Sequence, residues 1–166
     1  QRQMCIRDSH CFEQDWIFMT ERLRIGQIGI AHTHATKLVD AASRPALERL
    51  NVQIAGICEP DSAMFAERSG RDAWQGVNWI DDPGEIFEDD SIAAVFIETW
   101  PWDCLEWGRR AREAGKHIHL DKPPGATLEG LRELYEIAAA AGLFIQMGYQ
   151  WRFNPCLLYT SDAADD

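Results

Sequence analysis

The sequence lacks an excess of positive charge. Its 166 residues include 16 lysines and arginines against 27 aspartates and glutamates, and the net charge at pH 7 is −11. Nucleic acids and anionic membrane surfaces bind proteins nonspecifically through basic patches, so this balance argues against both as partners. The sequence also lacks a long apolar run. The longest one, residues 137–145, is interrupted by Gly142 and is far too short to span a bilayer.

Paired cysteines and targeting signals are missing as well. No N-terminal stretch of basic and then apolar residues ends in a small-residue cleavage site, so we expect a cytoplasmic protein. Of the five cysteines, Cys58 and Cys104 fall on a predicted strand and a predicted helix without paired spacing. We therefore expect these two to be free thiols in a reducing compartment.

What is present is an alternation of short apolar runs and amphipathic segments. Predicted strands begin at Leu23 and cover residues 52–58, 77–80, 92–98, 117–120 and 144–147. Predicted helices follow the turn at residues 29–35 and cover residues 62–68, 83–88, 102–114 and 128–141. Strands that alternate with helices predict one α/β domain built on a doubly wound, mostly parallel sheet.

A charged loop follows the predicted strand at residues 117–120. Asp121 and Lys122 come directly after this strand, and Pro123 and Pro124 prevent the strand from continuing. The proline after Lys122 also restricts the lysine to extended geometry. Because ligands of open α/β sheets bind at the carboxyl ends of the strands, we expect the Lys122 ammonium over a binding cleft.

A glycine turn follows the first predicted strand, as in dinucleotide-binding domains. Gly29 fits the first glycine that such a turn requires, whereas Ala31 and His34 stand where the second and third would be. The second strand ends at Glu59, a carboxylate suited to accept hydrogen bonds from an adenosine ribose. A glutamate at this place repels a 2′-phosphate, so we expect NAD as the cofactor, with NADP as the alternative.

His32 and His34 form a His-x-His pair that could suggest a metal ligand set. No Cys, Asp or Glu at ligand spacing accompanies them, so we favour a phosphate-facing loop, with Thr33 between them, and expect no metal. His117 and His119 alternate along a strand, where a hydrogen-bonded core position is the plainer interpretation. Trp100 is a candidate wall for the nicotinamide pocket.

Six motifs in one order resemble the Gfo/Idh/MocA oxidoreductases over residues 23–155. They are the glycine turn, Glu59-Pro60-Asp61, the strand that leads to Thr99 and Pro101, the helix exit at residues 115–117, Asp121-Lys122-Pro123, and residues 148–155. The sequence departs from the family at two places. The family usually has glutamate where Asp121 stands, and often histidine where Cys104 stands.

The resemblance implies an NAD(P)-dependent oxidoreductase that transfers hydride to or from a sugar, cyclitol or related polyol. It implies that Lys122 positions substrate and assists proton transfer, that the Lys122-Pro123 bond is cis, and that the full-length protein is a homo-oligomer. The implied cofactor-binding residues are Gly29, Ala31, His32, Thr33, His34, Glu59, Thr99, Trp100, Pro101, Asp121 and Pro123. A dinucleotide-binding protein without catalysis, an NAD-dependent lyase or glycosidase of the same family, and a methyltransferase remain alternatives, although the Asp121-Lys122-Pro123 loop argues against the last.

Both ends of the chain match the translation of one DNA string. CAGCGTCAGATGTGTATAAGAGACAG encodes residues 1–8, and its reverse complement, read one base in, encodes residues 156–163. The string resembles a sequencing adapter, so we expect residues 1–18 and 156–166 to lie outside the fold, with a genuine extension at residues 10–18 as the alternative. The dinucleotide-binding domain is then expected at residues 19–155, and the family's second α/β domain is expected beyond Pro155 in the parent gene.

Overall fold

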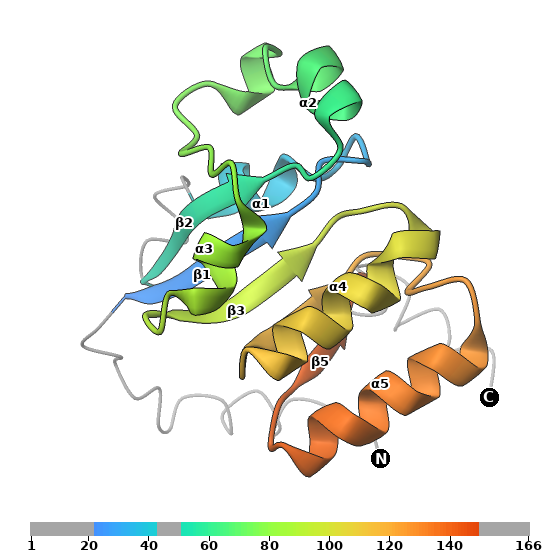
Figure 1. Cartoon of the computed structure of the whole chain (residues 1–166). Helices are drawn as coiled ribbons and strands as arrows, with labels where there is room; N and C mark the ends of the chain where they lie inside the picture. Colours follow the sequence, from blue (N-terminus) through green and yellow to red (C-terminus); the bar gives the residue numbers. More distant parts are fainter. Residues whose placement is uncertain (1–21, 43–50, 150–166) are drawn as a thin grey trace, which may run out of the picture.

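The computed structural model describes residues 22–42 and 51–149, which form an α/β domain around a five-stranded parallel sheet (Figure 1). The strands are β1 (Leu23–Ile28), β2 (Val52–Cys58), β3 (Ile92–Ile97), β4 (His117–Leu120) and β5 (Ile145–Met147). The helices are α1 (Lys37–Ala42), α2 (Ser62–Arg68), α3 (Pro83–Glu88), α4 (Pro101–Glu113) and α5 (Leu128–Ala140). A 3-10 turn lies at Asp72–Trp74. Within the described ranges, no helix is both long and apolar enough to cross a membrane.

The strand order places the functional edge of the sheet. The order is β2-β1-β3-β4-β5. After β1, the chain adds β2 on one side of β1, and it then crosses back and adds β3, β4 and β5 on the other side. β1 pairs with both β2 and β3, and all four pairings are parallel. In such a Rossmann-like sheet, ligands bind outside the carboxyl ends of the strands where the order reverses, which here is between β1 and β3.

Side-chain caps fix where several helices begin. The Asp61 carboxylate accepts the amides of Ala63 and Met64 at the start of α2, and the Thr127 hydroxyl accepts the amide of Gly130 at the start of α5. Each cap satisfies a backbone donor that the first helical turn leaves without a partner. These caps also set where each preceding loop ends, and the loop before α2 contains Glu59.

The core has two parts, one on each face of the sheet. Ile57 and Cys58 are neighbours in β2, are fully buried, and belong to different hydrophobic clusters. Because successive strand residues point to opposite faces, the two clusters cover opposite sides of the sheet. Figure 1 agrees, with α3 and α4 in front of the strands and α1 behind them.

Helices α4 and α5 pack closely at one glycine. A side chain at Gly108 would place its Cβ 2.6 Å from Leu134 Cδ2, so α5 can approach α4 only because this position lacks a side chain. Leu134 is fully buried there. The contact holds α4 and α5 over β4, and β4 leads directly to Asp121 and Lys122.

The structure confirms the predicted fold class and nearly all predicted elements. One prediction is wrong: residues 77–80 form an isolated bridge between Trp79 and Ile57 instead of a strand. The Asn78 side chain donates to the Ala55 carbonyl, and soon afterwards the chain turns into α3 at Asp82, so no regular pairing can extend. The thiols of Cys58 and Cys104 are free and buried, as expected. The proposed adapter segments and residues 43–50 and 150–155 lie outside the described residues.

We expect Leu134→Ala to lower the free energy of unfolding by about 2–5 kcal/mol, because it leaves a cavity between α4 and α5. Leu128 on the same helix is 73% exposed and is the matched control. Leu128→Ala should change the free energy of unfolding by less than about 0.5 kcal/mol. Urea unfolding followed by circular dichroism measures both. Equal effects of the two substitutions would contradict the packing of α5 described here.

Candidate functional site

The glycine turn lies against the carboxyl end of β3. Gly29 has a φ of +92°, and a Cβ there would lie 2.8 Å from the Glu98 carbonyl and 2.6 Å from Thr99 Cγ2. The Ala31 amide donates to the same Glu98 carbonyl at 2.9 Å. Only glycine tolerates this combination of positive φ and close backbone approach. The turn is therefore shaped as a dinucleotide-binding turn requires at its first glycine, although Ala31 and His34 replace the other two.

Glu59 is tied to this turn from the end of β2. Its carboxylate accepts the Ile30 amide at 2.7 Å and the Asp61 amide at 2.8 Å. Burial raises the pKa of the Glu59 carboxyl, and the two amides oppose that rise. A carboxylate has about four acceptor sites, so about two remain for ribose hydroxyls. Among the described residues, the amides of His32 and Thr33 donate no hydrogen bond and are free for phosphate oxygens.

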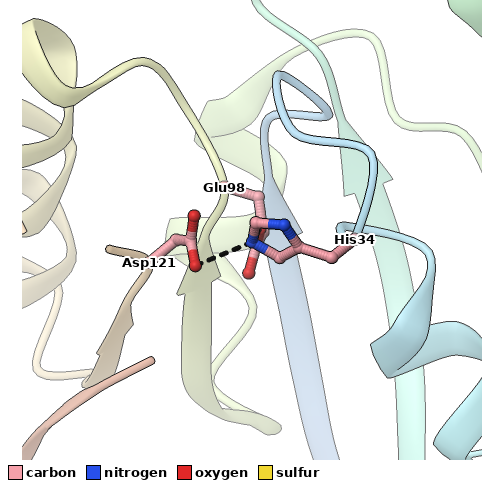
Figure 2. Close-up of side chains that lie close together, drawn as sticks. All are labelled: His34, Glu98 and Asp121. Atoms are coloured by element: carbon pink, nitrogen blue, oxygen red, sulfur yellow. Dashed lines mark ion pairs between the residues drawn. The ribbon is translucent and has the colours of Figure 1, made fainter. Parts of the chain in front are cut away.

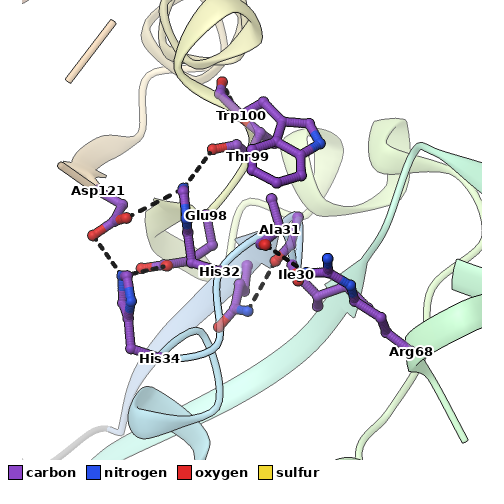
Figure 3. Close-up of polar contacts among 11 residues, drawn as sticks. Ile30, Ala31, His32, His34, Arg68, Glu98, Thr99, Trp100 and Asp121 are labelled. Atoms are coloured by element: carbon purple, nitrogen blue, oxygen red, sulfur yellow. Dashed lines mark hydrogen bonds and ion pairs between the residues drawn. The ribbon is translucent and has the colours of Figure 1, made fainter. Parts of the chain in front are cut away.

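Arg68 crosses the same turn, which the sequence analysis did not anticipate. Its Nη1 donates to the carbonyls of Ile30 at 3.2 Å and Ala31 at 2.5 Å, and its guanidinium lies 6.0 Å from the Trp100 ring (Figure 3). Arg68 is in the last turn of α2, nine residues after Glu59. No local sequence motif indicates this contact, because Arg68 reaches the turn only through the position of α2 in the folded chain.

A cavity of about 250 Å³ lies between the ends of β2 and β3. Its lining includes Ala31, Glu59, Thr99 and Trp100. Trp100 therefore lines the cavity that contains Glu59, and its role as a wall of the nicotinamide pocket stays a prediction. The indole packs edge-on to His32 and stacks on Trp102, and these contacts keep it on the β2 side.

A second cavity, of about 180 Å³, lies beyond the ends of β3, β4 and β5. Its lining includes His34, Glu98, Asp121 and Lys122. Lys122 is exposed, and the Lys122-Pro123 bond is cis, as the family resemblance implied. The glycine turn therefore has one cavity on each side, with Glu59 at the first and Lys122 at the second.

Two buried carboxylates and two histidines meet between these cavities. Glu98 is 3% exposed and Asp121 is 5% exposed. His34 Nε2 lies 2.8 Å from Asp121 Oδ1 and 3.6 Å from Glu98 Oε2. Figure 2 shows the three side chains, with a dashed line between His34 and Asp121. The His32 ring stacks on His34, and its Nε2 lies 3.4 Å from Asp121 Oδ2 and 3.2 Å from the Thr99 carbonyl (Figure 3).

The electrostatics of this cluster follow from its burial. Burial, and then the Asp121 carboxylate, raise the pKa of Glu98 to about 8, while Lys122 opposes the rise. Burial lowers the pKa of His32 and of His119, and Asp121 opposes both changes. Two neighbouring carboxylates in a dry environment disfavour double ionisation unless a cation joins them.

Cys104 lies near these carboxylates but is closed off from solvent. It is 2% exposed, and burial raises the pKa of its thiol to about 12, with smaller contributions from Asp121 and Glu98. A thiol held protonated in this way is a poor nucleophile. A further cavity of about 430 Å³ is lined by residues of the segment 78–89 together with Arg24, Ala55 and Ile92. It lies at the opposite end of the strands from the site.

The structure gathers most of the predicted site residues at this edge and adds others. Those that line the two cavities are Ala31, Glu59, Thr99, Trp100, His34, Asp121 and Lys122. Gly29 and His32 shape the turn between them, whereas Thr33, Pro101 and Pro123 line neither cavity. Glu98 and Arg68 were missed, and His119, interpreted from the sequence as a core position, lines the second cavity. Glu98 is the last residue of the predicted strand at residues 92–98, and this strand-end carboxylate was the signal that could have identified it.

Known proteins resemble this chain in sequence and in fold. The family model described as "Oxidoreductase family, NAD-binding Rossmann fold" matches residues 23–149. Inositol 2-dehydrogenase of Paracoccus denitrificans is 31% identical over 132 residues, which cover 78% of this chain and 36% of that protein. The scyllo-inositol 2-dehydrogenase (NAD(+)) of Bacillus subtilis is 35% identical over 77 residues, 46% of this chain and 22% of that protein.

A solved structure agrees with the fold. The 3-ketoreductase of Actinomadura kijaniata, in complex with NADP and TDP-benzene, has a TM-score of 0.70 or 0.71 in two of its structures, and the match covers 87% of this chain. At 21% identity this likeness shows the fold, and the match spans 42% of that enzyme. The glycine turn, the Glu59 strand end and the matched span lead to one conclusion: this chain belongs to the Gfo/Idh/MocA oxidoreductases and contains their NAD-binding Rossmann domain.

Proposed function

We propose that this chain is the cofactor-binding part of an NAD(P)-dependent dehydrogenase that acts on a sugar, cyclitol or related polyol. Hydride passes between the nicotinamide ring and a secondary alcohol carbon, and the cofactor supplies that chemistry. The observation that carries the proposal is the pair of cavities on either side of the glycine turn. One has the ribose-binding carboxylate Glu59, and the other has the cation Lys122.

The cofactor would extend across the turn from β2 to β4. Glu59 would bind the adenosine ribose, and the amides of His32 and Thr33 would contact the phosphates. The residues that line the cavity at the ends of β3 and β4 would hold the nicotinamide end of the cofactor. Lys122 stands at the mouth of that cavity, where its ammonium can position a substrate hydroxyl and favour loss of its proton.

Two relatives support the substrate class. The names of the Paracoccus and Bacillus proteins describe dehydrogenases of inositol, a cyclic polyol. The chain spans about a third or less of either protein, so the acid/base group of the complete enzyme is proposed to come from a second domain. Lys122 and Asp121 would then form the part of the substrate site that the Rossmann domain contributes.

Cofactor preference tests the role of Glu59. We expect this chain to bind NADH about tenfold or more tightly than NADPH, because a 2′-phosphate would meet the Glu59 carboxylate. In Glu59→Gln the shape and one acceptor remain but the charge is lost. NADPH affinity should rise, and Arg68, already at the turn, is the cation that would pair with the phosphate. Titration calorimetry with both nucleotides measures the change.

The exposed residue Glu88, in the last turn of α3, gives the control. Glu88→Gln makes the same chemical change away from the turn and should leave both affinities as they are. Tighter binding of NADPH than of NADH by the unsubstituted chain would reverse the assignment of NAD. Failure to bind either nucleotide would remove the basis of the proposed function.

Lys122→Met tests the catalytic role. In the protein joined to its second domain, we expect turnover of polyol to fall by about 10²–10⁴, with little change in NADH affinity. Lys122 is exposed, so removing its charge should change the melting temperature by no more than a degree or two. Arg132→Met, which removes an exposed cation from α5, is the control and should keep full turnover. Near-normal turnover of Lys122→Met would refute the assignment.

A further inference from the structure

We propose that His34, Glu98 and Asp121 bind a divalent metal ion of the zinc type at the ends of β3 and β4. The proposal concerns a different ligand from the dinucleotide and stands whether or not the polyol assignment is correct. Each residue comes from a different segment, namely the turn after β1, the end of β3 and the end of β4. Figure 2 shows their polar atoms pointing toward one another.

The distances suit a shared ion. Two ligands about 2.1 Å from one zinc ion at the tetrahedral angle lie about 3.4 Å apart. Here His34 Nε2 lies 2.8 Å from Asp121 Oδ1 and 3.6 Å from Glu98 Oε2. One ligand atom from each of the three residues lies within 4.8 Å of the others. Small side-chain rotations would place all three at bonding distance from one centre.

The buried polar atoms of this cluster lack hydrogen bonds. Glu98 Oε2, Asp121 Oδ2 and His34 Nε2 are all buried and, among the described residues, have no hydrogen-bond partner. The His34–Asp121 pair is 2.8 Å apart without hydrogen-bond geometry, so the two groups do not satisfy each other. Buried polar atoms in native proteins are almost always satisfied. A metal ion bound by His34 Nε2, Glu98 Oε2 and an oxygen of the Asp121 carboxylate would compensate all three groups.

The chemistry of the ligands selects the ion. One imidazole nitrogen and two carboxylates form a nitrogen and oxygen donor set, which suits Zn²⁺ and similar first-row divalent ions. The absence of a thiolate among these three argues against soft ions such as Cu(I), and the imidazole disfavours Mg²⁺, which prefers oxygen. Two carboxylates would also neutralise the ion's charge, and the ion would remove their mutual repulsion.

Three protein ligands leave an open coordination position, and the cavity lies beside them. The 180 Å³ cavity that contains Lys122 is lined by the same three residues. Catalytic zinc sites have this form, with three protein ligands and a fourth position for water or substrate. A water molecule would take the fourth position when no other ligand is bound.

The position of His34 shows why the spacing of possible ligands along the sequence did not reveal the cluster. It stands at the third glycine position of the turn, where glycine normally permits close packing of helix and strand. The imidazole instead reaches the ends of β3 and β4, 64 and 87 residues further along the chain. The expectation of no metal rested on ligands close in sequence, and the fold brings in ligands that are distant.

Zinc binding by the metal-free 166-residue chain tests the proposal. We expect one Zn²⁺ per chain in competition titrations with a chromophoric chelator, a rise in melting temperature, and much weaker binding of Mg²⁺. Glu98→Gln and His34→Gln should each weaken zinc binding by more than about tenfold, since removing a ligand costs at least as much as removing an outer partner. Glu136→Gln changes an exposed carboxylate on α5 and should bind zinc like the parent.

A second readout covers any variant that folds poorly. Co²⁺ added to the parent should give the visible absorption of a tetrahedral site without a thiolate band, and His34→Gln should lose it. Zinc held by surface groups would be unaffected by either substitution and would overturn the proposal. A chain that binds no zinc, and in which Glu98→Gln weakens only NADH binding, would show that these carboxylates serve the cofactor. Nucleotide titration of the same samples reports separately on the proposed function.

Discussion

The close approach of Gly29 to the end of β3 is the contact on which the rest of the site depends. The amide of Glu98 donates to Ile28, and the carbonyl of Glu98 accepts the Ala31 amide, so β3 and the turn are joined on both sides of Gly29. A side chain at Gly29 would meet the Glu98 carbonyl at 2.8 Å and separate them. The turn would then lose the position from which Ile30 reaches Glu59 and His34 reaches Asp121.

This contact divides one sheet edge into two chemically different cavities. On the β2 side, the Glu59 carboxylate accepts two backbone amides, and Arg68 Nη1 donates to two backbone carbonyls of the turn. On the β4 side, Glu98 and Asp121 are buried next to each other with unsatisfied oxygens. Burying such groups costs free energy unless a ligand compensates them. The first cavity leaves acceptor sites on Glu59 for a ribose, whereas the second holds carboxylate oxygens that have no hydrogen-bond partner among the described residues.

Much of the fold could be predicted, because its signals are local. The mostly apolar run at residues 92–98 predicts a strand. Gly115 indicates the end of α4, and Thr127 indicates the start of α5. The prediction of a strand at residues 77–80 was wrong, because an apolar run indicates an extended chain but does not specify a pairing partner. The site was predicted where a motif is continuous, as at Asp121-Lys122-Pro123. It was missed at Arg68 and Glu98, whose roles depend on segments distant in the sequence.

The sequence by itself determined the alternation of strands and helices, the glycine turn, the strand-end carboxylate Glu59 and the loop that presents Lys122. These features follow from periodicity, backbone conformation and the short range of caps and turns. Only the tertiary structure decided that His34, Glu98 and Asp121 meet, and that Trp100 and Glu59 line the same cavity. The reason is that parallel strands adjacent in the sheet bring together residues far apart in the chain, and the register of their pairing is a property of the whole core.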